Sequence, residues 1–456
     1  MNQAIIMAAG KGTRMNSNLP KVAHTISGVT MIECIINQLK IMGINDIVSV
    51  LGYKAEVIQD YIKDKSMIAI QHEQLGTGHA VMQAKQFENK KGKTLIINGD
   101  CPLIKANTLS NLLNSNNDYA LSVLTVKLDD PKSYGRIVRN DKGDIIKIVE
   151  FKDCNEQEKK IKEINTGIYC VDNELLFNNL SLLENNNAQK EFYITDLVEI
   201  FINKGLKVGA VICDNYKEVE GVNDQIELSS ANSYQYHLNN INHMNNGVVM
   251  IDAKSVYIDS FVEIGQETNI YPNVTIKGNT KIGKGCTILP NSFLNNAIIG
   301  DNCTIDSSRI TDSELKDEIT VGPNAHLRMG CVIDSKNRIG NFVELKNTKM
   351  GYNSRCAHLS YLGDSEVGAN VNIGCGVVTV NYDGVNKFKT IIKDGAFVGS
   401  NCNLIAPIII GEKALVAAGS TVNKNIEDGE MGIARPRQEN LKDFGYEYKK
   451  KEKVKN

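Results

Sequence analysis

Aliphatic residues recur at about every sixth position from residue 251 onward. They are Ile258, Ile264, Ile270, Ile276, Ile282, Ile288 and Leu294, then Ile299 and Ile305, then Val321, Leu327, Ile333, Ile339 and Leu345, and finally Ile392, Val398, Leu404, Ile410, Val416 and Val422. A period of six fits neither an amphipathic helix nor an alternating strand. It is typical of a β-helix, in which each hexapeptide forms one flat face of a coil. We therefore predict a left-handed parallel β-helix of hexapeptide repeats over residues 251–437.

The aliphatic register also leaves two gaps. It is lost between residues 305 and 321 and again between residues 350 and 391. We expect the coils to be interrupted at both places. Four cysteines of this region each follow an inward aliphatic residue by four positions: Cys286, Cys303, Cys331 and Cys402. Cysteine suits that position as a small inward-facing hydrophobic residue.

Residues 1–224 show a different pattern, in which short apolar runs alternate with helical segments. Strands are predicted at residues 4–7, 47–51, 94–97, 120–126 and 207–212, and helices at residues 31–42, 56–63 and 195–203. This alternation favours an α/β, Rossmann-like domain with a mostly parallel sheet. Ligands of such sheets bind at the carboxyl ends of strands. The loops AAGKGTR and NGDCP, each after a strand, are therefore the candidate binding loops.

Two further segments complete the organisation. A linker helix is predicted at residues 225–250, where Ile226, Tyr234, Leu238 and Ile241 are spaced for one apolar face. Residues 438–456 end in YEYKKKEKVKN and are predicted to be a solvated, charged tail.

The composition excludes several classes of protein. The formal net charge is −2, which gives the chain no general attraction to nucleic acid or to an anionic membrane. No apolar run is long enough to cross a bilayer, and the start of the chain lacks the layout of a secretion signal. Eleven cysteines without a Cys-x-x-Cys pair argue against a disulfide framework or a zinc site. We expect a cytoplasmic protein that binds neither nucleic acid nor membrane.

The turn after the first strand carries Gly10, Gly12 and Arg14, and Pro20-Lys21 follow shortly afterwards. Glycines let backbone N–H groups come close to phosphates. Arg14 and Lys21 supply the positive charge that a leaving pyrophosphate requires. Together these residues resemble the G-x-G-T-R…P-K motif of sugar-nucleotide pyrophosphorylases.

The resemblance continues along the chain. Residues 71–78, QHEQLGTG, resemble the loop that reads uracil in that family, and Asn98-Gly99-Asp100 resembles its metal-holding element. Other matching motifs are Tyr134-Gly135-Arg136, Val149-Glu150, Asn165-Thr166-Gly167 and Glu220-Gly221-Val222-Asn223. With the β-helix behind them, the chain is identified as a member of the bifunctional N-acetylglucosamine-1-phosphate uridyltransferase / glucosamine-1-phosphate N-acetyltransferase family.

The resemblance implies a role for each matching residue in uridylyl transfer. Arg14 and Lys21 would be catalytic and contact the phosphates, while Asp100 and Asn223 would ligate Mg²⁺. Binding of UTP and of UDP-N-acetylglucosamine is implied for Met7, Ala8, Ala9, Gly10, Lys21, Gln71, Gly76, Thr77, Asn98, Gly99, Asp100, Gly135, Glu150, Asn165 and Asn223. The chemistry agrees, because the attacking phosphate oxygen is already anionic and a hard cation prefers oxygen ligands.

Polar residues gather in the second gap of the repeat. HLSYLGD at residues 358–364 and NYDG at residues 381–384 resemble the acetyltransferase half of the same family. An amine that attacks a thioester needs a base, and the imidazole of histidine titrates near neutral pH. The resemblance assigns that role to His358.

The resemblance also implies the remaining ligands and partners. Glucosamine 1-phosphate would be bound by Arg328, Lys346, Tyr361 and Asn372, and acetyl-CoA by Cys375, Asn381, Tyr382, Ser400, Ala418 and Arg435. The family forms homotrimers with acetyl-transfer sites between subunits. Its product, UDP-N-acetylglucosamine, feeds peptidoglycan and lipopolysaccharide synthesis.

Cys375 departs from the family, whose members commonly have alanine there. It follows its aliphatic residue by two positions rather than four, which predicts an exterior position near the acyl donor. We expect a reactive thiol there, with the cations Lys346 and Arg328 nearby. The alternative is that cysteine merely replaces alanine and is shielded by its neighbours.

Three other readings of the whole chain stay open at this point. The chain could be a monofunctional sugar-nucleotide pyrophosphorylase whose β-helix is only structural, but such enzymes lack a cluster like His358, Tyr361 and NYDG. A metal-binding β-helix would need several converging histidines, and only His326 and His358 lie in this one. A non-enzymatic scaffold would leave the polar clusters of both domains unexplained.

Overall fold

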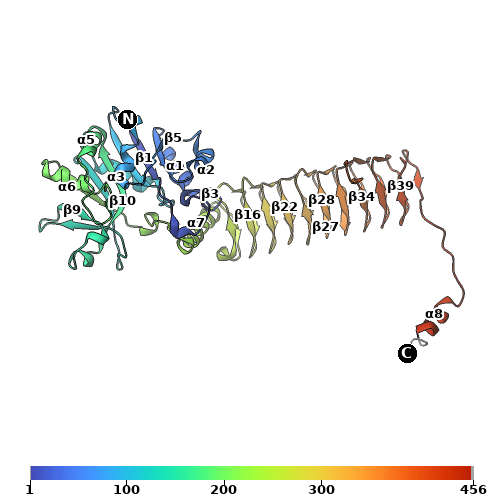
Figure 1. Ribbon diagram of the computed structural model, residues 1–456. Helices are drawn as coiled ribbons and strands as arrows, with labels where there is room; N and C mark the ends of the chain where they lie inside the picture. The colour runs from blue at the N-terminus through green and yellow to red at the C-terminus, as the bar shows by residue number, and fades with distance from the viewer. Residues whose placement is uncertain (1, 453–456) are drawn as a thin grey trace. The chain divides into compact units, whose positions relative to one another are not determined.

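The computed structural model of the protein describes residues 2–452. Their contacts divide them into two compact units, with the boundary between Leu238 and Asn239. The first unit is an α/β domain, and the second consists of short parallel strands (Figure 1). Helix α8 (Phe444–Glu452) lies in the predicted charged tail, and the last four residues of that tail, 453–456, are outside the described residues.

One mostly parallel sheet forms the centre of the first unit. Its strand order is β11-β7-β10-β6-β1-β4-β5, and β8 and β9 extend it beside β10. β10 runs antiparallel to its neighbours β6 and β7, whereas β1 is parallel to both β4 and β6. The strands are β1 (Gln3–Ala8), β4 (Ile47–Leu51), β5 (Met67–Ile70), β6 (Lys93–Asn98), β7 (Leu121–Lys127), β8 (Arg136–Arg139), β9 (Ile145–Val149), β10 (Glu163–Asp172) and β11 (Val208–Ile212), with a separate hairpin of β2 (Thr25–Ile26) and β3 (Val29–Thr30). The predicted α/β fold class is confirmed.

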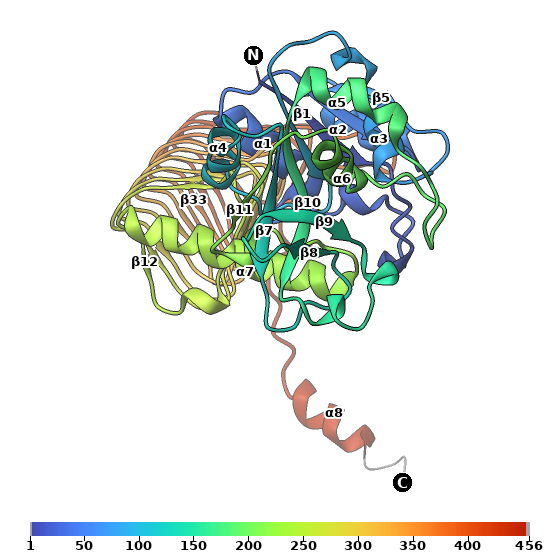
Figure 2. The ribbon, with the colours of Figure 1, turned by 90° about the vertical axis from the view of Figure 1, so that its left-hand side faces the viewer.

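Helices cover both faces of this sheet (Figure 2). Ile35 of α1, Ile58 of α2 and Leu109 of α4 pack on one face, and Leu176 of α5 and Phe201 of α6 pack on the other. The helices are α1 (Met31–Ile41), α2 (Ala55–Ile62), α3 (Thr77–Met82), α4 (Ala106–Ser115), α5 (Asn173–Asn179) and α6 (Asp196–Asn203). Because both faces are covered, β1 is apolar along almost its whole length. Polar side chains that reach a ligand are therefore expected mainly at the strand ends and in the segments next to them.

Helix α7 (Gln225–Asn245) forms where a linker helix is predicted. Its first half packs on the α/β core through Leu228, Ala231 and Tyr234. In its second half, Asn240 Nδ2 donates to the carbonyls of Ala253 at 2.8 Å and of Val256 at 2.9 Å, both in the second unit. The predicted apolar face is wrong at Ile226, which is 82% exposed. At 3.6 residues per turn, Ile226 lies about 200° around the helix from Leu228, so it faces away from the core.

The second unit is a β-helix whose coils contribute one strand to each of three parallel sheets in turn. Sheet 1 consists of β12 (Val249–Met250), β15 (Asn269–Ile270), β18 (Thr287–Ile288), β21 (Thr304–Ile305), β24 (Thr320–Val321), β27 (Arg338–Asn341), β30 (Arg355–His358), β33 (Asn372–Ile373), β36 (Phe397–Val398), β39 (Leu415–Val416) and β41 (Met431–Gly432). Sheet 2 consists of β13 (Tyr257–Ile258), β16 (Thr275–Lys277), β19 (Phe293–Asn295), β22 (Arg309–Thr311), β25 (His326–Leu327), β28 (Glu344–Lys346), β31 (Tyr361–Gly363), β34 (Val378–Val380), β37 (Asn403–Ile405) and β40 (Thr421–Val422). Sheet 3 consists of β14 (Glu263–Ile264), β17 (Lys281–Ile282), β20 (Ile298–Ile299), β23 (Glu314–Leu315), β26 (Val332–Ile333), β29 (Lys349–Met350), β32 (Ser365–Val367), β35 (Thr390–Ile392) and β38 (Ile408–Ile410).

The interior of the β-helix is a stack of aliphatic side chains. Ile270, Ile288 and Ile305 pair in register in consecutive coils of sheet 1, and all three are fully buried. Asparagine takes several of the left-handed turn positions, for example Asn302 at φ 56° and Asn353 at φ 55°, because its short polar side chain tolerates that conformation. The predicted left-handed β-helix of hexapeptide repeats is confirmed.

The first predicted interruption of the repeat is wrong, and the second is right only for residues 381–389. Ile310 and Leu315 fill the first gap, and they are buried in the same core. Cys356, Leu362, Val367, Ile373 and Thr379 fill the second gap, with at most 5% of each exposed. The coils merely change length by a residue or two, and cysteine or threonine replaces an aliphatic residue, so a strict six-residue search misses them. One segment does leave the coil, at residues 381–389, where Tyr382 forms an antiparallel bridge with Lys387.

All eleven cysteines are free. Cys286, Cys303, Cys331 and Cys402 are buried, as predicted, and their thiols fill the interior of the β-helix. Cys375 is exposed, which confirms its predicted exterior position. Among residues 2–452, no helix has the length and apolar character needed to cross a bilayer.

Candidate active sites

The first candidate site lies at the carboxyl ends of β1 and β6. Because these strands are parallel neighbours, Met7 and Asn98 pair in register and both loops leave the sheet at the same edge. The N–H of Gly99 donates to the carbonyl of Met7 at 2.8 Å, and a Cβ on Gly99 would lie 2.9 Å from that oxygen. Glycine is therefore needed for the two loops to approach so closely.

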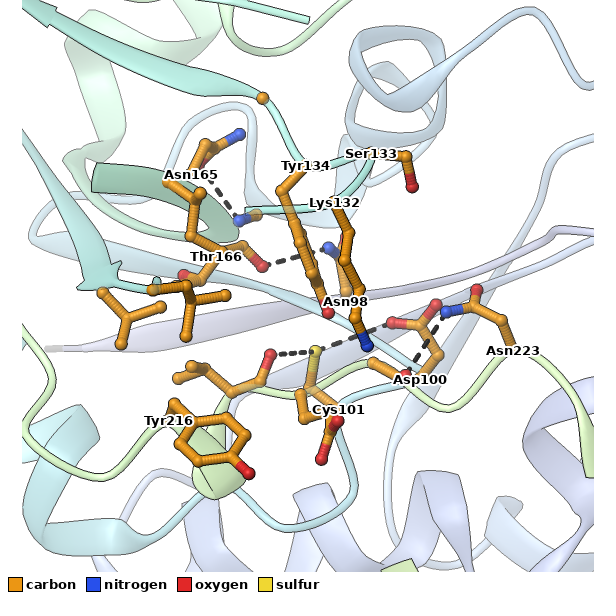
Figure 3. A pocket seen from close by; sticks show the side chains of 18 of the residues that line it. Asn98, Asp100, Cys101, Lys132, Ser133, Tyr134, Asn165, Thr166, Tyr216 and Asn223 are labelled. Atoms are coloured by element: carbon orange, nitrogen blue, oxygen red, sulfur yellow. Dashed lines mark hydrogen bonds between the residues drawn. The ribbon is translucent and has the colours of Figure 1, made fainter. Parts of the chain in front are cut away.

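A cavity of about 670 Å³ opens at this edge (Figure 3). The predicted residues that line it are Met7, Arg14, Thr77, Asn98, Asp100, Gly135, Glu150, Asn165 and Asn223. They come from segments spread over the whole first unit, so the fold brings the separate sequence motifs together around one cavity. The predicted residues Ala8, Ala9, Gly10, Lys21, Gln71, Gly76 and Gly99 are not among those that line it.

Lys21 nevertheless reaches the polar end of the cavity. Its Nζ lies 2.5 Å from Oδ2 of Asp100 and 2.8 Å from Oδ1 of Asn223. The same Asn223 oxygen accepts a hydrogen bond of 2.8 Å from the guanidinium group of Arg14. The two predicted catalytic cations and the two predicted metal ligands therefore form one cluster.

The oxygens of Asp100 and Asn223 are arranged to hold a cation. One ammonium group contacts both oxygens, which shows that they converge on a single point. A carboxylate and an amide oxygen are ligands that Mg²⁺ accepts, and Mg²⁺ usually completes its shell with water and substrate phosphates. The residues present thus fit the predicted metal.

The loop of residues 71–78 is held by its own polar contacts. Gln71 is buried, and its Nε2 donates to the carbonyl of Gly76 at 3.2 Å and contacts Nδ1 of His79 at 3.0 Å. Gly76 adopts φ 108°, and a Cβ there would lie 2.6 Å from the carbonyl oxygen of Phe192. Only glycine fits that position, and it places Thr77 at the start of α3 with its side chain on the cavity wall.

Gly135, Glu150 and Asn165 lie together on another wall of the cavity. The N–H of Asn165 donates to the carbonyl of Gly135 at 2.9 Å, and a Cβ on Gly135 would lie 3.4 Å from the Glu150 carboxylate. Burial, together with the negative charges of Asp153 and Asp196, raises the pKa of Glu150 to about 7. A carboxyl group in this setting can donate as well as accept a hydrogen bond near neutral pH.

The cavity also contains residues that carried no predicted role. Lys132, Ser133 and Tyr216 lie on its wall, and Figure 3 shows the amine of Lys132 directed toward Asp100. Gly167 lies against Asn98, whose side chain would clash with any Cβ there, and Asn98 Nδ2 donates to the carbonyl of Thr166 at 3.5 Å. The motif Asn165-Thr166-Gly167 could have revealed Thr166 and Gly167. Nothing in the spacing of the sequence points to Lys132 or Tyr216.

The second candidate site is on the β-helix, where Asn341 and His358 pair in register in consecutive coils. Nδ1 of His358 lies 2.9 Å from Oδ1 of Asn341, and the imidazole is otherwise exposed. Because an amide oxygen can only accept, this contact places the imidazole proton on Nδ1 and leaves Nε2 free to accept a proton. Asn341 was not predicted, although counting back one coil from His358 would have found it.

Three predicted acetyl-CoA residues continue this column of the β-helix. Extending the register of sheet 1 places Cys375 beside His358, Ser400 beside Cys375 and Ala418 beside Ser400. Backbone bonds support that order, because Asn401 N donates to Cys375 O at 2.7 Å and Gly419 N donates to Ser400 O at 2.8 Å. We call Asn341, His358, Cys375, Ser400 and Ala418 the corner column. Arg435 joins it through a hydrogen bond of 2.8 Å from its guanidinium group to the carbonyl of Ala418.

Most of the predicted glucosamine 1-phosphate residues lie on sheet 2, next to the corner column. Arg328 pairs with Glu344 at 2.8 Å, and Glu344 is the register partner of Tyr361. Lys346 follows on the same face, and the neighbouring ammonium of Lys387 lowers the pKa of Lys346. Two cations in this position suit a phosphate dianion.

Asn372, Asn381 and Tyr382 lie at separate positions around this face. Asn372 is on sheet 1, one coil after Arg355. Asn381 donates to Asp364 at 2.6 Å, while the hydroxyl of Tyr382 donates to the carbonyl of Gly384 at 2.5 Å. Asn381 is buried and Tyr382 is exposed.

The expected proximity of Cys375 to cations finds no support in the contacts. Arg328 is engaged by Glu344, and Lys346 lies beside Lys387. Among the hydrogen bonds and ion pairs of the described residues, none joins Cys375 to Arg328 or Lys346. The expected influence of those cations on the thiol stays a prediction, and the structure places Cys375 in the corner column.

Comparison with known proteins matches both units. A nucleotidyl transferase family model covers residues 3–228, and a bacterial transferase hexapeptide model of six repeats covers residues 261–296. A Bifunctional protein GlmU of Clostridioides difficile (strain 630) is 49% identical, over 96% of this chain and 95% of the relative. Those of Streptococcus agalactiae serotype V and of Geobacillus sp. (strain WCH70) are 48% and 47% identical, covering 98% and 97% of each chain. The chain belongs to the GlmU family. The family predicted from the motifs is therefore confirmed.

Membership of the GlmU family agrees with the way the two sites are built. The nucleotidyl transferase model spans the strands and loops that carry Arg14, Lys21, Asp100 and Asn223. The relatives cover the second unit as well, so the coils that carry the corner column are part of the shared architecture.

Proposed function

We propose that this chain makes UDP-N-acetylglucosamine in two steps, at two sites. The second unit acetylates glucosamine 1-phosphate with acetyl-CoA, and the first unit transfers UMP from UTP to the resulting N-acetylglucosamine 1-phosphate and releases pyrophosphate. The observation that carries this proposal is that one chain of the GlmU family holds both the Arg14, Lys21, Asp100 and Asn223 cluster and the His358 corner column.

In the first unit, a phosphate oxygen of the sugar 1-phosphate attacks the α-phosphorus of UTP, and the bond to the bridging oxygen breaks. The nucleophile is already anionic, so no side chain has to accept a proton. Lys21 and Arg14 neutralise the charge that develops on the leaving pyrophosphate. Asp100 and Asn223 would hold Mg²⁺, which would neutralise phosphate charge. Gly135, Glu150 and Asn165 bind the sugar, and Met7, Gln71, Gly76 and Thr77 bind the nucleoside.

In the second unit, the amine of glucosamine 1-phosphate attacks the thioester carbonyl of acetyl-CoA, a C–N bond forms, and the C–S bond breaks. Nε2 of His358 takes the proton that the amine loses. Asn341 holds the imidazole in the tautomer that leaves Nε2 free. The coenzyme A thiolate leaves and is protonated from solvent.

The substrates of this step fit on two adjoining surfaces. Arg328, Lys346, Tyr361 and Asn372 surround the sugar phosphate. Lys346 lies on sheet 2 in the coil next to that of His358, and Arg328 lies beside Lys346 one coil further away. The acyl donor extends along the corner column over Cys375, Ser400 and Ala418, with Asn381, Tyr382 and Arg435 at its sides.

We further infer a homotrimer in the cytoplasm. Phe397, Leu415 and Met431 pair in register along sheet 1 and are 48%, 36% and 56% exposed, which forms an apolar strip next to the corner column. A second copy of the chain would cover this strip. Eleven free cysteines suit a reducing compartment. Sedimentation of the purified protein tests the trimer, since a monomer at micromolar concentration contradicts it.

One experiment tests both activities. The protein is incubated with glucosamine 1-phosphate, acetyl-CoA, UTP and Mg²⁺, each is omitted in turn, and products are followed by mass. We expect UDP-N-acetylglucosamine only in the complete mixture, and N-acetylglucosamine 1-phosphate when UTP or Mg²⁺ is omitted. Uridylyl transfer without any acetylation would instead favour a pyrophosphorylase with a structural β-helix.

A further inference from the structure

Lys21 binds the two oxygens that the proposed function assigns to the metal. Its ammonium group lies 2.5 Å from Asp100 Oδ2 and 2.8 Å from Asn223 Oδ1, so it sits where a cation ligated by both oxygens would sit. The Lys21 side chain is 14% exposed and that of Asp100 is 26% exposed, which makes this a largely buried ion pair. Two cations cannot share this point, because like charges repel strongly where little water screens them.

The two oxygens are held in this arrangement by backbone contacts. Asn223 Nδ2 donates to the carbonyl of Gly221 at 3.3 Å, which turns Oδ1 of the amide toward Lys21. The N–H of Val222 donates to the carbonyl of Asp100 at 2.8 Å and ties the two loops together. The Asn223 oxygen and the backbone of Asp100 are therefore held in place independently of Lys21.

The stem of Lys21 is positioned by Gly12. A Cβ on Gly12 would lie 2.6 Å from Cβ of Lys21, which is the fixed part of the side chain. Gly12 also has φ 60°, a conformation that favours glycine. The base of the lysine is thus fixed, while its four-carbon arm can move its ammonium group.

We propose that Lys21 couples metal binding to nucleotide binding, because its ammonium group occupies the metal position until phosphate oxygens draw it away. This inference rests on the proposed uridylyl transfer. Phosphates of the nucleotide offer Lys21 stronger acceptors than Asn223 does, and its departure opens the point between the two oxygens, where only the hydrogen bond from Arg14 to Asn223 then remains. By linkage, a ligand that removes the lysine tightens metal binding, and metal binding favours the released lysine to the same extent.

The coupling has a consequence that does not involve turnover. Without nucleotide, the metal must displace Lys21, so its affinity is low. Lys21→Met keeps the length of the side chain and removes the competing charge. We expect this variant to bind Mn²⁺ about tenfold more tightly than the parent in the absence of nucleotide, within the usual range of coupling between two ligands.

The test measures free Mn²⁺ by electron paramagnetic resonance in titrations of the full-length protein without nucleotide. Lys11→Met is the matched control, because Lys11 is exposed in the same turn and, within the described residues, makes no hydrogen bond or ion pair with Asp100 or Asn223. It removes one positive charge at a similar place, and we expect less than about a twofold change. Equal tightening in both variants would mean a general charge effect and would overturn the proposal, as would unchanged or weaker binding in Lys21→Met.

A second measurement uses the parent protein, so it does not depend on the folding of a variant. Amine acetylation by a small activated ester is followed by mass spectrometry with and without Mg²⁺ and without nucleotide. We expect saturating Mg²⁺ to increase labelling of Lys21 several-fold and to leave Lys11 unchanged. If the acetylation of Lys21 is the same with and without Mg²⁺, the proposal is overturned. If the parent catalyses Mg²⁺-dependent uridylyl transfer but both measurements are negative, only this inference fails. If uridylyl transfer itself is absent, the proposed function fails.

Discussion

Asn341 and His358 lie one above the other in consecutive coils, with Oδ1 of Asn341 at 2.9 Å from Nδ1 of His358. The β-helix produces this pair by its repeat alone, since the same side-chain position recurs once in each coil. The amide orients the imidazole without adding a charge beside it. In the proposed acetyl transfer, the base, His358, is therefore distinct from the residue that positions it, Asn341.

His358→Ala is expected to slow acetyl transfer by roughly a hundredfold or more, which is the usual contribution of a general base. Asn341→Ala keeps the imidazole but loses its orientation, so we expect a loss of about tenfold in kcat with little change in the KM for acetyl-CoA. Uridylyl transfer from added N-acetylglucosamine 1-phosphate serves as the internal control and is expected to be unchanged in both variants. A loss below about tenfold in His358→Ala would make His358 a binding residue at most.

Asp100→Ala is expected to abolish Mg²⁺-dependent uridylyl transfer and to leave acetyl transfer intact. The carboxylate supplies one of the two converging oxygens, and its loss leaves Asn223 as a weak single ligand. Asp129→Ala is the matched control, because Asp129 lines the same cavity but pairs with Lys162 at 2.8 Å. Near-normal uridylyl transfer in Asp100→Ala refutes the metal assignment.

Glu150 is expected to make the first unit less stable as the pH rises. Its pKa is about 7 in the folded chain, against an ordinary value of 4.5, so the folded state retains a proton that the unfolded state loses. Between these two values the free energy of unfolding falls with rising pH, by up to about 3 kcal/mol at 1.36 kcal/mol per pH unit. Asp196, whose pKa burial raises to about 6, adds a change of the same sign.

Glu150→Gln removes the contribution of this carboxyl group. Thermal melting is expected to show the variant more stable than the parent at pH 8 and similar to it at pH 4.5. Glu56→Gln, at an exposed position of α2, is the control and is expected to shift neither value. An equal gain at both pH values would show that ionisation of Glu150 is not the cause.

A thiol alkylator is expected to block acetyl transfer before it affects uridylyl transfer. Cys375 is exposed within the corner column, whereas Cys402 and the other cysteines of the β-helix are buried. Acetyl-CoA is expected to slow the inactivation, because the donor covers Cys375. Cys375→Ala is expected to keep acetyl transfer and to resist the reagent. Inactivation of that variant at the rate of the parent would assign the effect to another cysteine.

A fragment of residues 1–247 is expected to retain uridylyl transfer and to lose acetylation. It contains the cavity, its cation cluster and the whole of α7, and it ends before the coils. The full-length chain, assayed in parallel with N-acetylglucosamine 1-phosphate, provides the reference rate. A folded fragment without uridylyl transfer would contradict the independence of the first site.

The sequence predicts those parts of the fold that follow from a regular period. Ile282, Ile288 and Ile339 are buried because each coil needs an inward aliphatic residue at a fixed interval. Cys356 and Thr379 are equally inward, but their residue types hide the period, so the strict pattern ended too early. The prediction that Ile226 belongs to the apolar face of its helix was wrong, because four apolar residues in one helix need not share a face.

The sites were less predictable than the fold, because their contacts join distant segments. Motifs identify Lys21, Asp100 and Asn223 separately, but their mutual contacts span 79 and 202 residues of sequence. The raised pKa of Glu150 depends first on its burial, and then on the negative charges of Asp153, three residues away, and of Asp196 at the start of α6. Asn341 follows from coil length, which varies along the β-helix and must be known before the partner of His358 can be counted.

In the proposed function, the number of coils in the corner column sets the length over which the acyl donor is bound. Neighbouring coils are spaced about 4.8 Å apart, as in any parallel sheet, so the three steps from His358 to Ala418 span about 14 Å. Each step corresponds to one coil of sequence, so the distance between His358 and Ala418 can change only by whole coil spacings. Insertion or deletion of one complete coil between Cys375 and Ala418 would therefore keep the regular stacking of the coils. It would move Ala418 by one coil spacing relative to His358, so the far end of the donor would no longer meet it.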